Sequence, residues 1–75
     1  MHVFNKLYAE KLARRIRARM EELDINQKEL SKRSGITPAS ISCYCRGTDI
    51  PKADAVVKLA AGLHMTTDEL INFQV

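Results

Sequence analysis

The chain contains few of the residues that interrupt regular structure: two prolines and three glycines occur among 75 residues. Together with a hydrophobic content of 45%, this composition argues against intrinsic disorder. No hydrophobic run approaches membrane-spanning length. The first twenty residues do not predict a secretory signal, because charged side chains interrupt them throughout. These side chains are Lys6, Glu10, Lys11, Arg14, Arg15, Arg17 and Arg19. A cytoplasmic location is therefore expected.

Cysteine is also scarce, and the two that occur, Cys43 and Cys45, lie two residues apart. On a helix this spacing points the side chains in nearly opposite directions, so a bond between them is not expected. His2 and His64 lie far from both in the sequence, so the pattern for metal binding is weak. We expect packing or contact roles for the thiols and no metal or cofactor. Redox sensing by an exposed Cys43 is the alternative.

No arrangement of catalytic residues is recognisable. The chain has no phosphate-cradling loop and no nucleophile with a plausible partner base, and its acidic residues are spread over the surfaces of expected helices. An enzyme is therefore not expected.

Residues 1–75 are long enough for one small domain with a single core, which buries ~60% of the unfolded surface. The net charge of +3 is unevenly distributed. Residues 1–46 carry ten basic and five acidic side chains, whereas residues 47–75 carry two basic and four acidic ones. A basic first part is compatible with a nucleic-acid partner, although a basic run is more often a solvated helix face.

Residues 26–34 begin the most informative stretch of the chain. Asn26 and Glu29 have the spacing of a capping box, in which each side chain satisfies a backbone amide of the first helical turn. A helix is therefore predicted to begin at Gln27. It ends at Gly35, because glycine adopts the left-handed conformation at little cost.

A second short helix follows almost at once. Thr37 is a suitable N-cap, and Pro38 fits the first helical position, where its missing N–H is not needed. Ile41 and Tyr44 share one face of this helix, which ends at Gly47. Two short helices joined by a tight turn are the outline of a helix-turn-helix.

Three further helices complete an all-α prediction. A long first helix begins after Asn5 and runs to about Leu23, a fourth covers about 53–63, and a short fifth helix follows Thr66, which forms a capping box with Glu69. The basic side chains of the first helix are too scattered to reach one DNA strand, so some of them are expected to be solvated. The residues expected to face the core are Leu12, Ile16, Met20, Leu23, Val56, Leu59, Ala60 and Leu63.

The segment NQKELSKRSGITPASISCYCRG, residues 26–47, resembles the helix-turn-helix of the Cro and phage-repressor family. The matching residues are Gln27, Leu30, Gly35, Ile36, Ile41 and Gly47. LAAGLHMTTDELI, residues 59–71, is similar to the closing helices of the same family, so the resemblance covers about residues 10–72. It implies a compact five-helix, repressor-like DNA-binding domain whose second and third helices form the motif. The implied function is that of a transcriptional regulator, most simply a repressor.

In a helix-turn-helix the second motif helix lies in the major groove, with its first turn and the residue one turn later at the base edges. The resemblance implies that Pro38, Ala39 and Cys43 occupy these base-contacting positions. Thr37 and Ser40 suit phosphate or backbone contacts better. Ser42 lies at the edge of the same surface.

Other residues are candidates for phosphate contacts. Gln27, at the positive end of its helix, is similar to the family glutamine that contacts phosphate. The further candidates are Lys28, Lys32, Arg46 and Lys52.

Two features depart from the family pattern. The base-contacting positions hold no group for bidentate pairing with guanine or adenine, so readout is expected to use thymine methyl contacts, serine hydroxyls, Arg46 if it folds back, and DNA shape. We therefore expect weak base discrimination. In addition, Cys45 and Met20 stand where many relatives carry a glutamate and some pair it with an arginine, so an apolar contact is expected there.

Two functional classes remain open. The first is a regulator that binds a double-stranded DNA operator as a homodimer, and the second is an antitoxin or anti-repressor that acts mainly through a protein partner. A steep fall of affinity with salt would favour DNA. The candidates for a dimer interface are Leu70, Ile71, Phe73 and Val75. For Leu70 and Ile71 the alternative is that they close the core.

Overall fold

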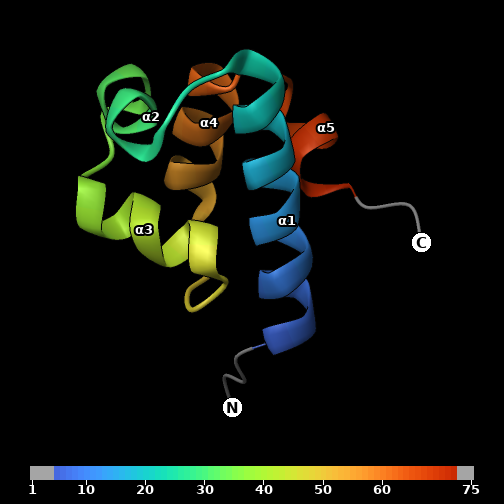
Figure 1. Cartoon of the computed structure of the whole chain (residues 1–75). Coiled ribbons are helices and arrows are strands. Elements are labelled where there is room, and N and C mark those ends of the chain that lie inside the picture. The colour runs from blue at the N-terminus through green and yellow to red at the C-terminus, as the bar shows by residue number, and fades with distance from the viewer. Residues whose placement is uncertain (1–4, 73–75) are drawn as a thin grey trace.

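The computed structural model describes residues 5–72, which consist of helices and the loops between them (Figure 1). The helices are α1 (Lys6–Leu23), α2 (Gln27–Ser34), α3 (Pro38–Arg46), α4 (Ala53–Gly62) and α5 (Thr67–Ile71). The predicted all-α, five-helix fold is confirmed. Within residues 5–72, no helix combines the length and the apolar character needed to cross a membrane.

Short polar side chains set the predicted helix starts. The side-chain oxygens of Asn5, Asn26 and Thr37 each accept a hydrogen bond from the backbone N–H three residues later, at 3.0, 2.8 and 3.3 Å respectively. Gly35 and Gly47 end α2 and α3 with a left-handed φ of 76°. The boundaries of α1, α2 and α3 are therefore those predicted, because capping is a local property of the sequence.

The two predicted capping boxes differ in the structure. At the start of α5 the box is complete: the Thr66 N–H donates to Glu69 Oε1 at 2.8 Å, and the Glu69 N–H donates to Thr66 Oγ1 at 3.0 Å. At the start of α2 only the Asn26 half forms. The Glu29 carboxylate instead accepts a hydrogen bond from Arg33 Nε at 3.2 Å. The prediction of a reciprocal box at Asn26 was wrong because an ion pair one turn along the helix engages the same carboxylate.

One hydrophobic core joins the helices. α1 packs against α3 and α5, while α2 packs against α3 and α4. The predicted apolar faces of α1 and α4 lie in this core, although Leu23 and Val56 are only partly buried. The fully buried large side chains are Leu12, Ile16, Leu30, Ile41, Leu59, Leu63 and Leu70.

Helix α4 ends one residue earlier than predicted, at Gly62. A Cβ at this position would lie 3.2 Å from Leu30 Cδ1 and 3.2 Å from the Cβ of Ser34. The glycine therefore lets the end of α4 approach α2 closely. This contact fixes the back of the helix-turn-helix against the rest of the domain.

Three arginines of α1 donate hydrogen bonds to backbone carbonyls. These carbonyls belong to other helices or to the residues that directly follow a helix. Arg15 Nε donates to the Glu69 carbonyl at 2.7 Å, Arg17 donates to the Cys45 carbonyl, and Arg19 donates to the carbonyls of Leu63 and His64 at 2.9 and 3.0 Å. Helix carbonyls near a C-terminus lack partners within their own helix, so these guanidinium groups satisfy them. These arginines are thus structural rather than simply solvated.

Candidate nucleic-acid interface

The turn between α2 and α3 is held by two serines of α2. Ser31 Oγ donates to the carbonyl of Ile36, and the Ile36 N–H donates to Ser34 Oγ at 3.2 Å. Both the N–H and the carbonyl of Ile36 are therefore hydrogen-bonded to α2, and this sets the direction of α3 relative to α2. The glycine pattern of the sequence predicts the turn but does not show that these two serines hold it.

The inner side of α3 is docked on the core. Ile41 is fully buried, and the Sγ of the buried Cys45 lies 3.8 Å from Met20 Sδ. The predicted apolar contact between Cys45 and Met20 is therefore present. Arg17 adds a hydrogen bond to the Cys45 carbonyl. α3 is thus attached to α1 through both side chains and backbone.

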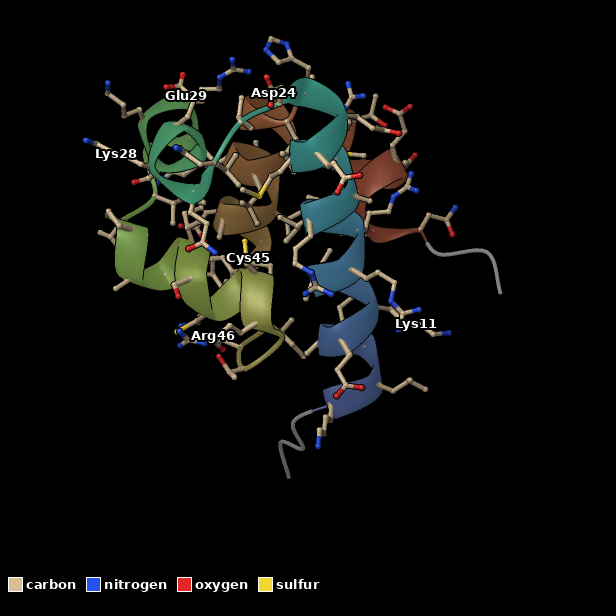
Figure 2. The ribbon with its side chains drawn as sticks, viewed as in Figure 1. Lys11, Asp24, Lys28, Glu29, Cys45 and Arg46 are labelled. Carbon is tan, nitrogen blue, oxygen red and sulfur yellow. The ribbon has the colours of Figure 1, made fainter. Side chains whose placement is uncertain are left out.

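The opposite side of α3 faces solvent. We call it the outer face of α3; it consists of Pro38, Ala39, Ser42, Cys43 and Arg46. Pro38, Ala39 and Arg46 are exposed, while Ser42 and Cys43 are half-buried. Figure 2 shows Arg46 pointing away from the other helices and Cys45 pointing into the core. The three residues implied as base-contacting therefore lie together on one accessible surface.

Arg46 folds back along this face. Its Nη1 donates to Ser42 Oγ at 2.8 Å, and its Nη2 lies 3.7 Å from Cys43 Sγ. The guanidinium group therefore lies one helical turn closer to the N-terminus of α3 than the Arg46 backbone does. The fold-back on which readout by Arg46 depends is therefore present.

Thr37 and Ser40 lie at the side of α3 that faces α4. Thr37 Oγ1 accepts the Ser40 N–H and donates to Ser40 Oγ at 3.1 Å, so both hydroxyls are engaged locally. Ser40 also lines a hollow between α3 and α4. These two residues therefore stabilise the start of α3, and Thr37 is the more exposed of the two.

Lys52 is exposed and lines the same hollow between α3 and α4. Asp49 and Asp54 line it too, and their charges reduce the positive potential that Lys52 provides. Burial, followed by the charges of these two carboxylates, raises the pKa of the neighbouring Tyr44 phenol. The phenol therefore stays neutral at physiological pH.

The first turn of α2 presents Gln27 and Lys28, both exposed. Lys28 points away from the body of the domain in Figure 2. The N-terminal backbone N–H groups of a helix and its dipole favour an anion at this position. Lys32 is also exposed and, with Lys28, lines a shallow hollow beside the connection from α1 to α2.

Among the described residues, no group of three or more His, Cys, Asp or Glu side chains could hold a metal ion.

The residues proposed for a dimer interface lie in different environments. Leu70 is fully buried in the core of its own chain, so its side chain has no surface to offer a second copy. Ile71 is partly buried and packs on the same core. These positions agree with the alternative in which both residues close the core. Phe73 and Val75 lie outside the described residues.

Comparison with known families supports the helix-turn-helix assignment. A helix-turn-helix family model matches residues 16–70, which include all of α2, α3 and α4. Comparisons with curated proteins and with solved structures find no match to the chain. The matched range agrees with the resemblance seen over about residues 10–72, and proteins of this family are DNA-binding regulators. Because the match covers most of the chain and the two-helix geometry is present, the protein belongs to the Cro/C1-type helix-turn-helix family.

Proposed function

We propose that this protein is a sequence-specific regulator of transcription, most simply a repressor, that binds double-stranded DNA with α3 in the major groove. The outer face of α3 carries the proposal. It presents small side chains and one arginine at helical spacing, on a helix whose inner side is attached to the core. Small side chains let a helix approach the base edges closely.

Each part of the surface has a role suited to its chemistry. Ala39 and Cys43 provide apolar groups for contact with thymine methyls. Gln27 and the backbone N–H groups at the start of α2 suit a phosphate. Lys28 and Lys52 are exposed and would add phosphate contacts, which increase affinity without reading sequence.

The proposal includes a homodimer on the DNA. A single domain of this size offers few base contacts, and two copies can place their α3 helices in successive major grooves, ~34 Å apart. A pair bound in this way covers a promoter and excludes other proteins from it. Phe73, Val75 and the exposed part of Ile71 are the remaining candidates for contact between the copies.

A second function is capture of a protein partner by an antitoxin or anti-repressor. The side chains of Leu7 and Val57 support it, since they are 63% and 58% exposed. Single exposed hydrophobic residues are nevertheless common on protein surfaces, and these two lie on different helices, α1 and α4. DNA binding is therefore favoured.

The deciding experiment is a selection of bound duplexes from random DNA at low and at physiological salt, with the mass of the protein in solution measured in parallel. We expect enrichment of a palindrome with half-sites one helical turn apart. Enrichment of no sequence, with only salt-labile binding, would overturn the proposal and favour a protein partner.

A matched pair of substitutions tests the location of the surface. Ala39→Glu places a carboxylate on the outer face of α3, where it would repel phosphates, so DNA affinity should fall at least tenfold. Ala18→Glu adds the same group at an exposed position of α1 that lies beside His64 and Met65. The control variant should bind within about twofold of the parent chain. Equal losses in both variants would place the DNA elsewhere.

A further inference from the structure

Arg46 is the only charged residue on the outer face of α3. Within residues 5–72 the ion pairs are Arg19–Glu22 and Arg33–Glu29, so no carboxylate of the described chain neutralises Arg46. Its two side-chain contacts are with the Ser42 hydroxyl and the Cys43 sulfur. The guanidinium group therefore has no ion-pair partner within residues 5–72, while its position along the helix is restrained.

The direction of this restraint is important for recognition. Ser42 and Arg46 lie one turn apart, and the hydrogen bond of 2.8 Å draws the guanidinium toward the N-terminal part of α3. That part of a recognition helix is the one nearest the base edges. An arginine in this position is turned toward the groove floor, whereas one extended beyond Gly47 would reach the backbone.

The guanidinium group of Arg46 has donors free for pairing with a base. A guanidinium is planar and carries several N–H donors, of which the contacts with Ser42 and Cys43 use two. The remaining donors can make the bidentate pair with O6 and N7 of guanine, the commonest specific contact in the major groove. The neighbouring Ala39 and Cys43 are small, so they do not hold the helix away from the DNA.

We infer that Arg46 is the specificity-determining residue of this surface and reads one guanine in each half-site, with Ser42 as its positioning residue. This inference rests on the proposed function. Weak base discrimination is then no longer expected at every position. We expect one strongly specified base pair in each half-site and weak discrimination at its neighbours.

The test compares the parent chain with Arg46→Lys, Ser42→Ala and Lys28→Ala in the same selection, followed by affinity measurements on the selected duplex and on its guanine-to-adenine variants. The parent chain should prefer guanine at one position per half-site by roughly tenfold. Arg46→Lys keeps the charge but cannot pair bidentately, so its preference should fall to about twofold with an unchanged salt dependence. Ser42→Ala should lose part of the preference. Lys28→Ala should bind all duplexes more weakly, with the guanine preference intact.

The outcomes are distinguishable. If Arg46→Lys retains the guanine preference, the inference is overturned while the proposed function stands. The same holds if the parent chain selects a defined site in which the preference for guanine does not depend on Arg46. A fourth variant, Arg46→Ala, is measured on the same duplexes. If it weakens binding to all sequences equally and lowers the salt slope by about one, Arg46 contacts phosphate and the inference is again overturned. If the parent chain enriches no sequence, the proposed function fails and the inference fails with it. Circular dichroism spectra of each variant verify that the exposed substitutions leave the helices intact.

Discussion

Cys43 and Cys45 have the same side chain but different environments. Cys43 is half-buried on the outer face of α3 beside Arg46, whereas Cys45 is buried against Met20. Burial raises the pKa of the Cys45 thiol, and the charge of Arg17 lowers it by a smaller amount. Since the thiolate is the reactive form, Cys45 is protected from chemical modification both by its buried position and by its raised pKa.

Thiol labelling should therefore proceed in two phases. Iodoacetamide should modify Cys43 in the native protein and modify Cys45 only as the domain unfolds, because a buried, protonated thiol is unreactive. Mass spectrometry at increasing urea concentrations measures both reactions, and Cys43→Ala should remove the fast phase alone. Labelling of Cys43 should also weaken DNA binding. An unchanged affinity for DNA after complete labelling would exclude Cys43 from the DNA interface.

At the scale of the helix, capping accounts for most of what could be predicted from the sequence. Asn5, Thr37 and Thr66 each form the predicted cap, and Gly35 and Gly47 end their helices as expected. These signals act within four residues of the chain, so the sequence alone reveals them. The incomplete box at Asn26 shows the limit, because a competing partner within the same helix determined the outcome.

The capping box of α5 should make stability depend on pH in the acidic range. Hydrogen bonds from the Thr66 backbone and side chain, assisted by the charges of Arg19 and Arg15, lower the pKa of Glu69. A group whose pKa is lower in the folded state contributes stability above its unfolded pKa, ~4.3 for Glu, and loses it as pH falls through the folded pKa. Glu69→Gln keeps a capping side chain without the charge. Between about pH 5 and about pH 3, the free energy of unfolding should therefore fall less for this variant than for the parent chain.

Thermal unfolding of the parent chain and of Glu69→Gln across this pH range measures the effect. Parallel curves for the two proteins would show that the carboxylate does not contribute in the way proposed. Thr66→Ala should cost about 1 kcal/mol at neutral pH by removing the other half of the cap.

At the scale of the whole molecule, one core connects α5 to the helix-turn-helix. Leu70 from α5 lies in the same cluster as Leu12, Leu30 and Ile41, so it touches the core on which α3 is docked. A small domain has only ~5–15 kcal/mol of stability in total. Loss of a core side chain at one end of the chain is therefore expected to weaken DNA binding at the other. Truncation after Glu69 consequently does not isolate a dimer interface, because it also removes part of the core.

Leu70→Ala should lower the free energy of unfolding by ~2–5 kcal/mol, because it leaves a cavity in a fully buried site. Val57→Ala, at a side chain that is 58% exposed, should change it by less than ~0.5 kcal/mol. Urea denaturation provides both values. A small loss for Leu70→Ala, accompanied by a change from dimer to monomer in solution, would instead return Leu70 to the interface between two copies.

The features that the sequence did not predict depend on contacts between distant segments. Arg15, Arg17 and Arg19 resemble an ordinary basic helix face, yet each binds carbonyls that lie 28 to 54 residues away. Nothing in the local spacing distinguishes such an arginine from a solvated one. The sequence likewise does not determine the position of Leu70, because an apolar residue at this place in the chain fits both a core and an interface. For the candidate site, helical spacing and the family resemblance together predicted the outer face of α3, whereas the hydrogen bonds of Arg46 required coordinates.

The attachment of α1 to backbone carbonyls has an evolutionary consequence. A carbonyl is present whatever side chain its residue carries, so the contact of Arg17 with residue 45 does not depend on which amino acids occupy the outer face of α3. Substitutions at Pro38, Ala39, Ser42 or Cys43 can therefore accumulate without loosening the helix from the domain. In this way the fold allows the DNA site to diverge while the scaffold that presents α3 is inherited unchanged.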